Sequence, residues 1–417
     1  MLLMRSYLFK MKKSELDNLI ICHKCHTLHE KTPLHQGAKA LCSKCNVLLY
    51  QRDDNMLNKT LALVVTSFIL LVVAFQFTII TININGLEQS LNLTSLFVVI
   101  LEHEQYVVGI MLLFLIVLFP LIILVSMFFL LLYMKIGKAA YLVKRLLILL
   151  AYLRPWSMID IFFISLLVAM VKLFDVALIE LGVSFIAFIL MLIIDLIITK
   201  NISFYELWEY HEKIYGEKMP KQNREEKLIR CPVCEAVNND NEDEISCRRC
   251  HAKIYQPKHI SYHKTVAYLI TAIILYIPAN LYPILISKQF GINTESTIMG
   301  GIMHLWEHGS YPIAIIILMA SVFIPLLKFM FIIYLLLSTK YNVNSSRVDK
   351  HKLFYITEVI GPWSMIDVFV VLILSVLIHF TGIQIYPGAG ATAFALMVFF
   401  TMLSALSFDT RLIKKEV

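Results

Sequence analysis

Eight long apolar stretches limit what this chain can fold into more than any other feature of its sequence. They lie at about residues 60–82, 107–134, 159–181, 183–199, 265–286, 312–337, 361–381 and 390–407. A helix of about 20 apolar residues spans the hydrocarbon core of a bilayer. The whole chain is 59% hydrophobic and 16% charged, whereas soluble domains are about half apolar and a quarter charged. The sequence therefore predicts an integral membrane protein whose spans are helices.

Lysine and arginine are distributed unevenly between the segments that join these stretches. Segment 83–106 contains neither residue, and segment 287–310 contains only Lys288. Segments 135–154 and 338–352 contain five and four of them. Because basic loops stay cytoplasmic, we expect both termini and the polar N-terminal segment on the cytoplasmic side. The net charge of +7 then follows from this bias, with anionic membrane lipids as partners and no need for nucleic acid.

Several markers occur twice in the same order. The stretch PWSMID occupies residues 155–160 and 362–367, an offset of 207 residues, and Pro120 and Pro325 are 205 residues apart. Markers that recur at nearly one offset indicate a tandem repeat. Four spans in each copy leave both copies facing the same way, so we expect a parallel repeat rather than an inverted one.

All eight cysteines fall into two groups of four. Cys22, Cys25, Cys42 and Cys45 follow the pattern C-x2-C-x16-C-x2-C, and Cys231, Cys234, Cys247 and Cys250 follow C-x2-C-x12-C-x2-C. Two C-x-x-C knuckles at such a separation can place four thiolates around Zn2+ in a zinc ribbon. Four thiolates leave no open position for water, so the sequence predicts two structural zinc sites.

Three other readings of these cysteines are possible. Disulfides are rare in the cytoplasm, where we expect this part of the chain, and a redox-active C-x-x-C pair needs no second knuckle. The stretches CHKCH at 22–26 and CRRCH at 247–251 match the haem-attachment pattern. Covalent haem attachment takes place outside the cytoplasm, however, so we expect His26 and His251 to lie beside the metal or to replace one ligand.

The predicted fold is therefore an all-α integral membrane protein with two tandem four-helix transmembrane modules, each preceded by a small cytoplasmic zinc ribbon. The expected boundaries are 1–55 for the first ribbon, 56–200 for the first module, 201–260 for a linker and the second ribbon, and 261–417 for the second module.

The PWSMID stretch places an acid inside the membrane in each module. Proline suits the first turn of a helix, and tryptophan anchors a helix at the headgroup level. The acid follows about one turn deeper, where a carboxylate is unfavourable without a partner. The simpler explanation is that an acid in the first turn complements the helix dipole, but we expect Asp160 and Asp367 to lie slightly beyond the first turn.

The second module offers a partner for its acid. Lys328 and Asp367 lie at similar depths on successive spans, measured from their cytoplasmic ends at 1.5 Å per residue. Thr401 lies at that depth on the last span, and Ser321 and Ser364 share helix faces with Lys328 and Asp367. We expect one buried polar cluster of these five residues, with a pure packing role as the alternative.

The first module lacks an equivalent lysine. At the offset of 205, Ile123 corresponds to Lys328 and Ile116 corresponds to Ser321. Asp160 would therefore need Lys172 or Arg154 as its partner. We expect the second module to carry the working cluster and the first to be more structural.

Taken together, these features resemble the paraquat-inducible protein A family. The resemblance covers both cysteine groups, both PWSMID stretches, PANLYPI at 278–284, SVFIPLLK at 321–328 and SFDTR at 407–411. It implies a bacterial inner-membrane subunit that moves lipid between the inner and outer membranes. It also implies a periplasmic tunnel-forming partner built from mammalian-cell-entry domains, and a polar network at Ser321, Lys328, Ser364, Asp367 and Thr401.

Two other functions fit parts of the sequence. Four C-x-x-C pairs suit a membrane redox protein with bound haem, an iron–sulfur cluster or cycling thiols. Alternatively, the ribbons bind a cytoplasmic partner and the helices only anchor a scaffold. The sequence contains no phosphate-binding loop, serine nucleophile motif or cofactor fingerprint, so we do not expect an enzyme.

Overall fold

The computed structural model shows a mostly helical chain that divides into two compact units. It describes residues 16–53, 55–84, 87–102, 106–173, 178–201, 204–216, 220, 228–239, 246–254, 258–289, 292–307, 309, 311–341, 350–380 and 383–408. The first unit, here called the ribbon unit, comprises residues 1–64, 125–154 and 197–257. The second, the helical unit, comprises residues 65–124, 155–196 and 258–417.

The ribbon unit holds both cysteine groups. Its elements are η1 (Leu16–Asn18), β1 (Leu19–Ile21), β2 (Leu28–Glu30), β3 (Lys39–Leu41), β4 (Leu48–Gln51), α5 (Ala140–Leu153), α8 (Phe204–Tyr215), β8 (Leu228–Arg230) and β9 (Val237–Asn239). The strands pair as three antiparallel hairpins, β1–β2, β3–β4 and β8–β9. Leu19 and Ile21 of the first ribbon share a small apolar core with Val237 of the second, so the two ribbons pack against each other.

The remaining helices occur in two matching series. The first series is α1 (Met56–Gln76), α2 (Leu93–Glu102), α3 (Tyr106–Leu112), η2 (Leu113–Leu118), α4 (Phe119–Ile136), η3 (Arg154–Trp156), α6 (Ile159–Leu173) and α7 (Val183–Asn201). The second series is α9 (Lys258–Leu281), α10 (Ile298–Glu307), α11 (Tyr311–Leu318), η4 (Met319–Phe323), α12 (Ile324–Lys340), α13 (Lys350–Ile360), η5 (Gly361–Met365), α14 (Ile366–Leu377) and α15 (Ala389–Ser407). With α5 of the ribbon unit in the place of α13, the two halves have the same order of helices, which agrees with the predicted repeat.

Six helical segments of the described chain are long and apolar enough to cross a membrane. They are Met56–Gln76, Tyr106–Ile136, Ala140–Val171, Ser261–Leu281, Ala314–Lys340 and Ala389–Ser407. Stretch 183–199 becomes a seventh only if it is counted with α8, from which it is bent by 63°. Stretch 361–381 yields the shorter apolar helix Trp363–Leu377. The eight predicted stretches are therefore helical over most of their length, although only six pass as spans by themselves.

Two small sheets in the helical unit were not expected. The strands β5 (Ile80–Ile84), β6 (Leu87–Leu91) and β7 (Leu178–Leu181) pair in the order β6-β5-β7. The strands β10 (Leu285–Gln289), β11 (Ile292–Ser296), β12 (His379–Phe380) and β13 (Ile383–Pro387) pair in the order β11-β10-β13-β12, and every pairing is antiparallel. The all-α expectation missed these sheets because apolar strands such as β7 simply prolong the preceding apolar helix.

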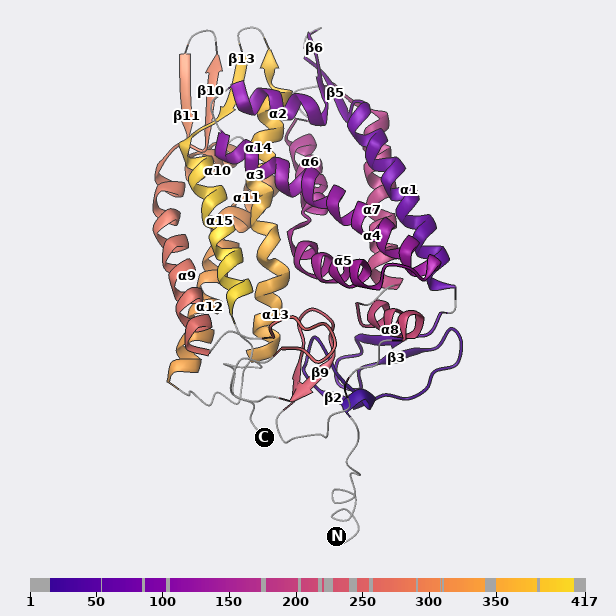
Figure 1. The fold of residues 1–417 in the computed structure, drawn as a ribbon. Helices are drawn as coiled ribbons and strands as arrows, with labels where there is room; N and C mark the ends of the chain where they lie inside the picture. Colours follow the sequence, from indigo (N-terminus) through magenta and orange to yellow (C-terminus); the bar gives the residue numbers. More distant parts are fainter. Residues whose placement is uncertain are drawn as a thin grey trace. The chain divides into compact units, whose positions relative to one another are not determined.

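The sheets follow the same repeat as the helices. In the helical unit, β10, β11 and β13 lie at one end of α9 and α15, which run side by side (Figure 1).

The two helices of the PWSMID stretches, α6 and α14, also pack together. Phe162 of α6 and Phe369 of α14 are equivalent at the offset of 207, and their ring centroids lie 6.0 Å apart. Contact between equivalent residues indicates an approximate twofold axis between α6 and α14, which parallel and inverted repeats can both have.

Candidate functional site

Each of the four cysteine knuckles has the same backbone turn. The residue directly after the second cysteine has a positive φ: 53° for His26, 53° for Asn46, 61° for Glu235 and 59° for His251. The amide of that residue donates to the carbonyl of the first cysteine at 2.9–3.0 Å. Histidine and asparagine are among the residues that tolerate this left-handed conformation. The turn therefore accounts for the C-x-x-C-H pattern without haem.

The four sulfurs of each group converge on one point. Contacts join cysteines of different knuckles, at 3.5 Å for Cys22–Cys45, 3.4 Å for Cys25–Cys42, 3.7 Å for Cys231–Cys250 and 3.3 Å for Cys234–Cys247. Tetrahedral zinc with bonds of about 2.3 Å to sulfur separates its ligands by about 3.8 Å, whereas a disulfide is about 2.05 Å long. Each group can therefore hold a metal ion with four cysteine ligands, and neither group includes His26 or His251.

The third cysteine of each group receives extra hydrogen bonds. His29 Nε2 lies 3.2 Å from Cys42 Sγ. In the second ribbon, Asn238 Nδ2 and the Arg249 amide lie 3.6 Å and 3.4 Å from Cys247 Sγ. Donors of this kind stabilise a thiolate and orient it toward a metal. His26 directly follows Cys25 and is not one of the converging ligands, and the sequence reasoning missed His29, which contacts Cys42 Sγ.

The thiols of the first group differ in acidity. Burial raises the pKa of Cys22 to about 12. Burial also tends to raise the pKa of Cys25, but hydrogen bonds from the Thr27 hydroxyl and amide outweigh it and lower that pKa to about 6. A bound metal ion favours the thiolate form of every ligand, so metal binding to this group releases protons at neutral pH.

Helix α8 holds the first ribbon through its acidic residues. The Glu206 carboxylate accepts a hydrogen bond of 2.7 Å from the Gln51 amide at the end of β4. Glu209, one turn further along α8, pairs with Lys31 at 3.4 Å. The helix thereby provides a hydrogen-bond acceptor for a backbone amide at the end of this strand.

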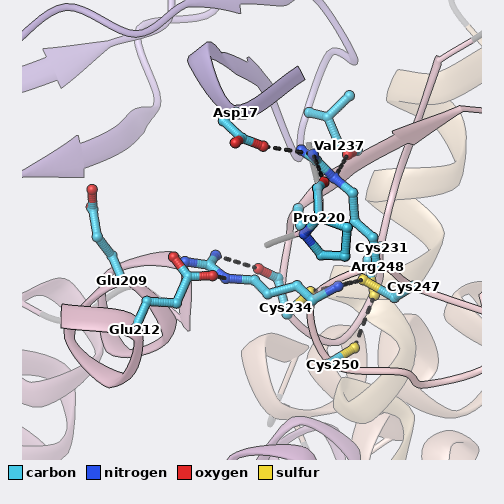
Figure 2. A network of polar contacts seen from close by, with 12 residues as sticks. Asp17, Glu209, Glu212, Pro220, Cys231, Cys234, Val237, Cys247, Arg248 and Cys250 are labelled. Carbon is cyan, nitrogen blue, oxygen red and sulfur yellow. Dashed lines mark hydrogen bonds and ion pairs between the residues drawn. The ribbon is translucent and has the colours of Figure 1, made fainter. Parts of the chain in front are cut away.

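The same helix holds the second ribbon. Glu212 pairs with the buried Arg249 at 2.8 Å, and the two ribbons are joined directly by an ion pair of 2.6 Å between Arg248 and Asp17. Figure 2 shows Glu209 and Glu212 on one helix, and Arg248 between Asp17 and the second cysteine group. These contacts make the two ribbons and α8 one body.

Lys328 lies in the interior of the helical unit. It belongs to α12, and only 1% of its surface is exposed. Its Nζ donates to the carbonyl of Gly361 at 3.1 Å, to Ser364 Oγ at 3.2 Å and to Thr401 Oγ1 at 2.9 Å. These acceptors come from η5 and α15. The structure thus brings three of the five predicted cluster residues together around one ammonium group.

Ser321 and Asp367 form the second contact of this region. The Ser321 hydroxyl donates to the carboxylate of Asp367, which is 8% exposed. As far as the described residues go, the Lys328 ammonium contacts neutral oxygens and not this carboxylate. Ser321 and Lys328 are seven residues, or about 10 Å, apart along the helix direction. They therefore meet the PWSMID segment at different heights, and the expected direct contact between the lysine and the acid is replaced by two neighbouring contacts.

Ser321 sits in a widened turn of its helix. Segment η4 is a π-helical turn in which the Ile324 amide donates to the carbonyl of Met319, and Pro325 follows at once. A proline lacks the amide proton and its ring crowds the carbonyl four residues earlier, which here belongs to Ser321. The first half has the same turn, η2, directly before Phe119 and Pro120. Such turns are frequent at functional sites.

The first module does not reproduce this arrangement. Asp160 lies in the first turn of α6 and is exposed. Lys172 is twelve residues further along the same helix, or about 18 Å, so the two belong to opposite ends of α6; the Lys172 side chain lies outside what the structure describes. Ile116 occupies the position of Ser321 and is buried. Residues 409–411 of the SFDTR stretch also lie outside the described residues.

Comparisons with known proteins agree with the repeated architecture. The family model described as paraquat-inducible protein A matches the chain twice, over residues 57–212 and 262–417. The intermembrane transport protein PqiA of Escherichia coli strain K12 is 32% identical over 398 residues, which cover 94% of both chains. The lipophilic envelope-spanning tunnel protein A of the same strain is 28% identical over 393 residues, or 94% of this chain and 90% of that protein.

A third relative covers less of the chain. The probable intermembrane transport protein of Haemophilus influenzae is 29% identical over 279 residues, which are 65% of this chain and 66% of that protein. No solved structure matches the chain significantly.

Proposed function

Because the chain belongs to the paraquat-inducible protein A family, we propose that it is the inner-membrane subunit of an intermembrane lipid transport system. The observation that carries this proposal is the match to relatives named for intermembrane transport and for an envelope-spanning tunnel along 94% of the chain. The family model itself matches residues 57–212 and 262–417, which contain most of both helical modules. A transport role also fits a chain made largely of apolar helices.

The partner is a periplasmic tunnel-forming protein of the mammalian-cell-entry type. An inner-membrane subunit alone cannot reach the outer membrane, and one relative is named for a tunnel that spans the envelope. The segments that contain few basic residues, 83–106 and 287–310, face this partner. The ribbons and both termini are cytoplasmic, because the segments rich in lysine and arginine remain on that side.

The zinc ions are structural. Cys22, Cys25, Cys42 and Cys45 hold one ion, and Cys231, Cys234, Cys247 and Cys250 hold the other. Each ion cross-links two hairpins that have little apolar core of their own, and this cross-linking stabilises the fold. Asn238 and His29 orient one thiolate in each site.

The working part of the molecule is the polar cluster of the second module. Lys328 is buried among neutral oxygens, and the nearby Asp367 carboxylate accepts a hydrogen bond from Ser321. An ionisable side chain inside a membrane is energetically unfavourable, and such residues commonly mark functional positions. A proton or an anionic lipid headgroup that reaches this region changes the hydrogen bonds of Lys328, and those bonds join α12 to η5 and α15. The cluster thereby links ligand or proton binding to the packing of three helical segments.

Complementation tests this proposal. A bacterial strain that lacks this gene receives Lys328→Met, Asp367→Asn or the control Lys340→Met, which changes an exposed lysine of the same helix. Transfer of labelled phospholipid between inner and outer membrane fractions is measured together with protein level. The first two variants accumulate but lose transfer, and the control keeps it. Wild-type transfer in both cluster variants would contradict the role of the cluster.

The same strain separates the two alternative functions. If the chain were a scaffold, replacing a ribbon with an unrelated zinc module would abolish activity while the cluster variants would not. If it were a redox protein, the purified chain would contain haem, an iron–sulfur cluster or cycling thiols. A colourless protein with about two zinc ions per chain, as two closed cysteine sites predict, supports the transport proposal.

A further inference from the structure

The two metal sites differ in how far they are shielded from solvent. All four cysteines of the second group are buried. In the first group Cys22 and Cys42 are buried, but Cys25 and Cys45 are only half-buried. A zinc ligand at the surface can be reached by a competing ligand, whereas all four cysteines of the second site are shielded from solvent.

The half-buried Cys25 has a hydrogen-bond partner outside the metal site. The hydroxyl of Thr27 lies 3.1 Å from Cys25 Sγ. At the offset of 209, the equivalent pair in the second ribbon is Cys234 and Ala236, and alanine has no hydroxyl. A thiolate at Cys25 can therefore leave a metal ion and still be stabilised by a donor, which Cys234 cannot do in this way.

His29 lies next to the same cysteine group, although, like His26, it is outside the set of converging ligand atoms in this structure. His29 Nε2 is 3.2 Å from Cys42 Sγ, and Cys25 Sγ is 3.4 Å from that sulfur. The nitrogen and sulfur ligands of one tetrahedral zinc ion lie about 3.6 Å apart. His29 and Cys25 thus both stand at about ligand distance from Cys42.

Among the described residues of the second ribbon, the position equivalent to His29 offers no such replacement. Asn238 is equivalent to His29 at the offset of 209 and contacts Cys247, the equivalent of Cys42. Its amide nitrogen is a hydrogen-bond donor without a lone pair for a metal ion. Neutral imidazole, by contrast, is a common zinc ligand.

We propose that the first site exchanges its zinc with the surrounding solution through replacement of Cys25 by His29, and that the second site is permanently closed. This inference concerns the ribbons alone and does not depend on the proposed lipid transport. It assigns a metal-exchange role to a site that the ligand pattern alone describes as structural.

The exchange step is a ligand substitution without electron transfer. The bond between zinc and Cys25 breaks, and the thiolate keeps the electron pair and accepts a hydrogen bond from Thr27. The proton of His29 moves to Nδ1, and the lone pair on Nε2 forms the new bond to zinc. The site changes from four thiolates to three thiolates and one imidazole, so its net charge rises by one and zinc is held less tightly.

Zinc release from the purified full chain tests the proposal without any substitution. The protein, loaded with two zinc ions, is mixed with excess 4-(2-pyridylazo)resorcinol, which binds zinc and reports it by colour. We expect one zinc ion to leave at least about tenfold faster than the other, the scale on which outer-shell groups alter zinc affinity. Alkylation of free thiols after the fast phase, followed by mass spectrometry, should modify the cysteines of the first ribbon. Release of both ions at one rate would overturn the proposal.

Reciprocal variants identify the exchanging ligand. Cys25→Ser should keep both zinc ions because His29 replaces the lost thiolate, whereas Cys25→Ser combined with His29→Asn should keep one. In the second ribbon, Cys234→Ser should lose its zinc, and addition of Asn238→His should restore it. Zinc is counted by elemental analysis on monodisperse protein. The assignment to His29 is wrong if the single Cys25→Ser variant loses its zinc as Cys234→Ser does, or if the double variant in the first ribbon keeps it.

Discussion

At the scale of single residues, Lys328 shows how a charged group is accommodated inside apolar helices. Its three acceptors also have partners of their own: Ser364 donates to the Gly361 carbonyl at 2.9 Å, and Thr401 donates to the Val398 carbonyl at 2.7 Å. Replacing Lys328 with methionine therefore leaves none of these groups unsatisfied. Exchanging a buried ionic group for an apolar one of similar volume is often neutral or stabilising. The lysine is thus unnecessary for folding, which is why loss of transport in Lys328→Met would report on function.

Two equivalent glycines provide a prediction about folding. A Cβ atom at Gly388 would lie 2.3 Å from the Pro283 carbonyl oxygen, and one at Gly182 would lie 2.0 Å from that of Thr78. Each glycine is the single residue between a strand and the last helix of its half, and the carbonyls belong to the backbone. We expect Gly388→Ala to lower the free energy of unfolding by about 1–3 kcal/mol, as overpacked sites do. Thermal unfolding in detergent measures it.

The control for this prediction is Gly301→Ala. Gly301 lies inside α10 and has no atom within 4 Å of an added Cβ. Alanine there should leave stability unchanged or raise it by up to about 1 kcal/mol, because glycine is the weaker helix former. Equal stability of the Gly388 and Gly301 variants would show that the close approach at Gly388 relaxes without strain.

At the scale of elements, the π-helical turn η4 positions Ser321. A π-helical turn holds one residue more than an α-helical turn, and deleting Val322 removes that residue. The helices on both sides then keep their register, but Ser321 takes the next position along the helix. Its side chain then rotates by about 100°, the angle per residue in an α-helix, away from Asp367. We expect a folded protein that no longer transfers lipid, as judged by protein level and the membrane-fraction assay.

The matched control deletes Val117 from η2, the equivalent turn of the first half. Ile116 stands there in place of Ser321, so this deletion moves no polar contact and should preserve transfer. If the two deletions behave alike, the π-helical turn of the second half has no special role.

Helices of this chain were predictable because each needs about 20 apolar residues in a row, and strands were not. The strand β5 has the sequence ITINI and is separated from α1 by only three residues. Its isoleucines therefore extend the apolar stretch of the helix. Strands of four or five residues leave too short a pattern to separate from a helix end. The helix α14 is a related case. All of its twelve residues are buried, because other helices and strands surround it, and a short helix suffices where protein replaces lipid.

The candidate sites were predictable to different degrees. The cysteine groups follow from spacing, because metal geometry fixes ligand separation. The neighbours of Lys328 followed from helical depth, which is regular at 1.5 Å per residue. The actual partner of each group did not follow, since a shift of a few ångströms decides whether Lys328 reaches Ser364 or Asp367. His29 was missed because its contact with Cys42 joins two separate hairpins, β1–β2 and β3–β4, and residue spacing does not reveal how these approach each other.

At the scale of the whole molecule, duplication explains the frame but not the site. Elements recur in the same order, and equivalent phenylalanines of α6 and α14 contact each other. Equivalent positions nevertheless differ in chemistry: Asp160 is exposed whereas Asp367 is buried, and isoleucines replace Ser321 and Lys328. A duplicated frame with one polarised half suits a protein in which one module provides the working cluster and the other supports it.

A parallel repeat makes a specific prediction about membrane topology. Glu88 of β6 and Asn293 of β11 are equivalent at the offset of 205, and both are exposed. In a parallel repeat with cytoplasmic basic loops, both residues face the periplasm. A maleimide that cannot cross the inner membrane should therefore label Glu88→Cys and Asn293→Cys in intact cells. Lys340→Cys, at the basic end of α12, should be labelled only after lysis. The wild-type chain is the control, because it shows how much of the labelling comes from the ribbon cysteines. Labelling of only one of the first two positions before lysis would mean that the two halves face opposite sides, and labelling of Lys340→Cys alone would reverse the proposed orientation.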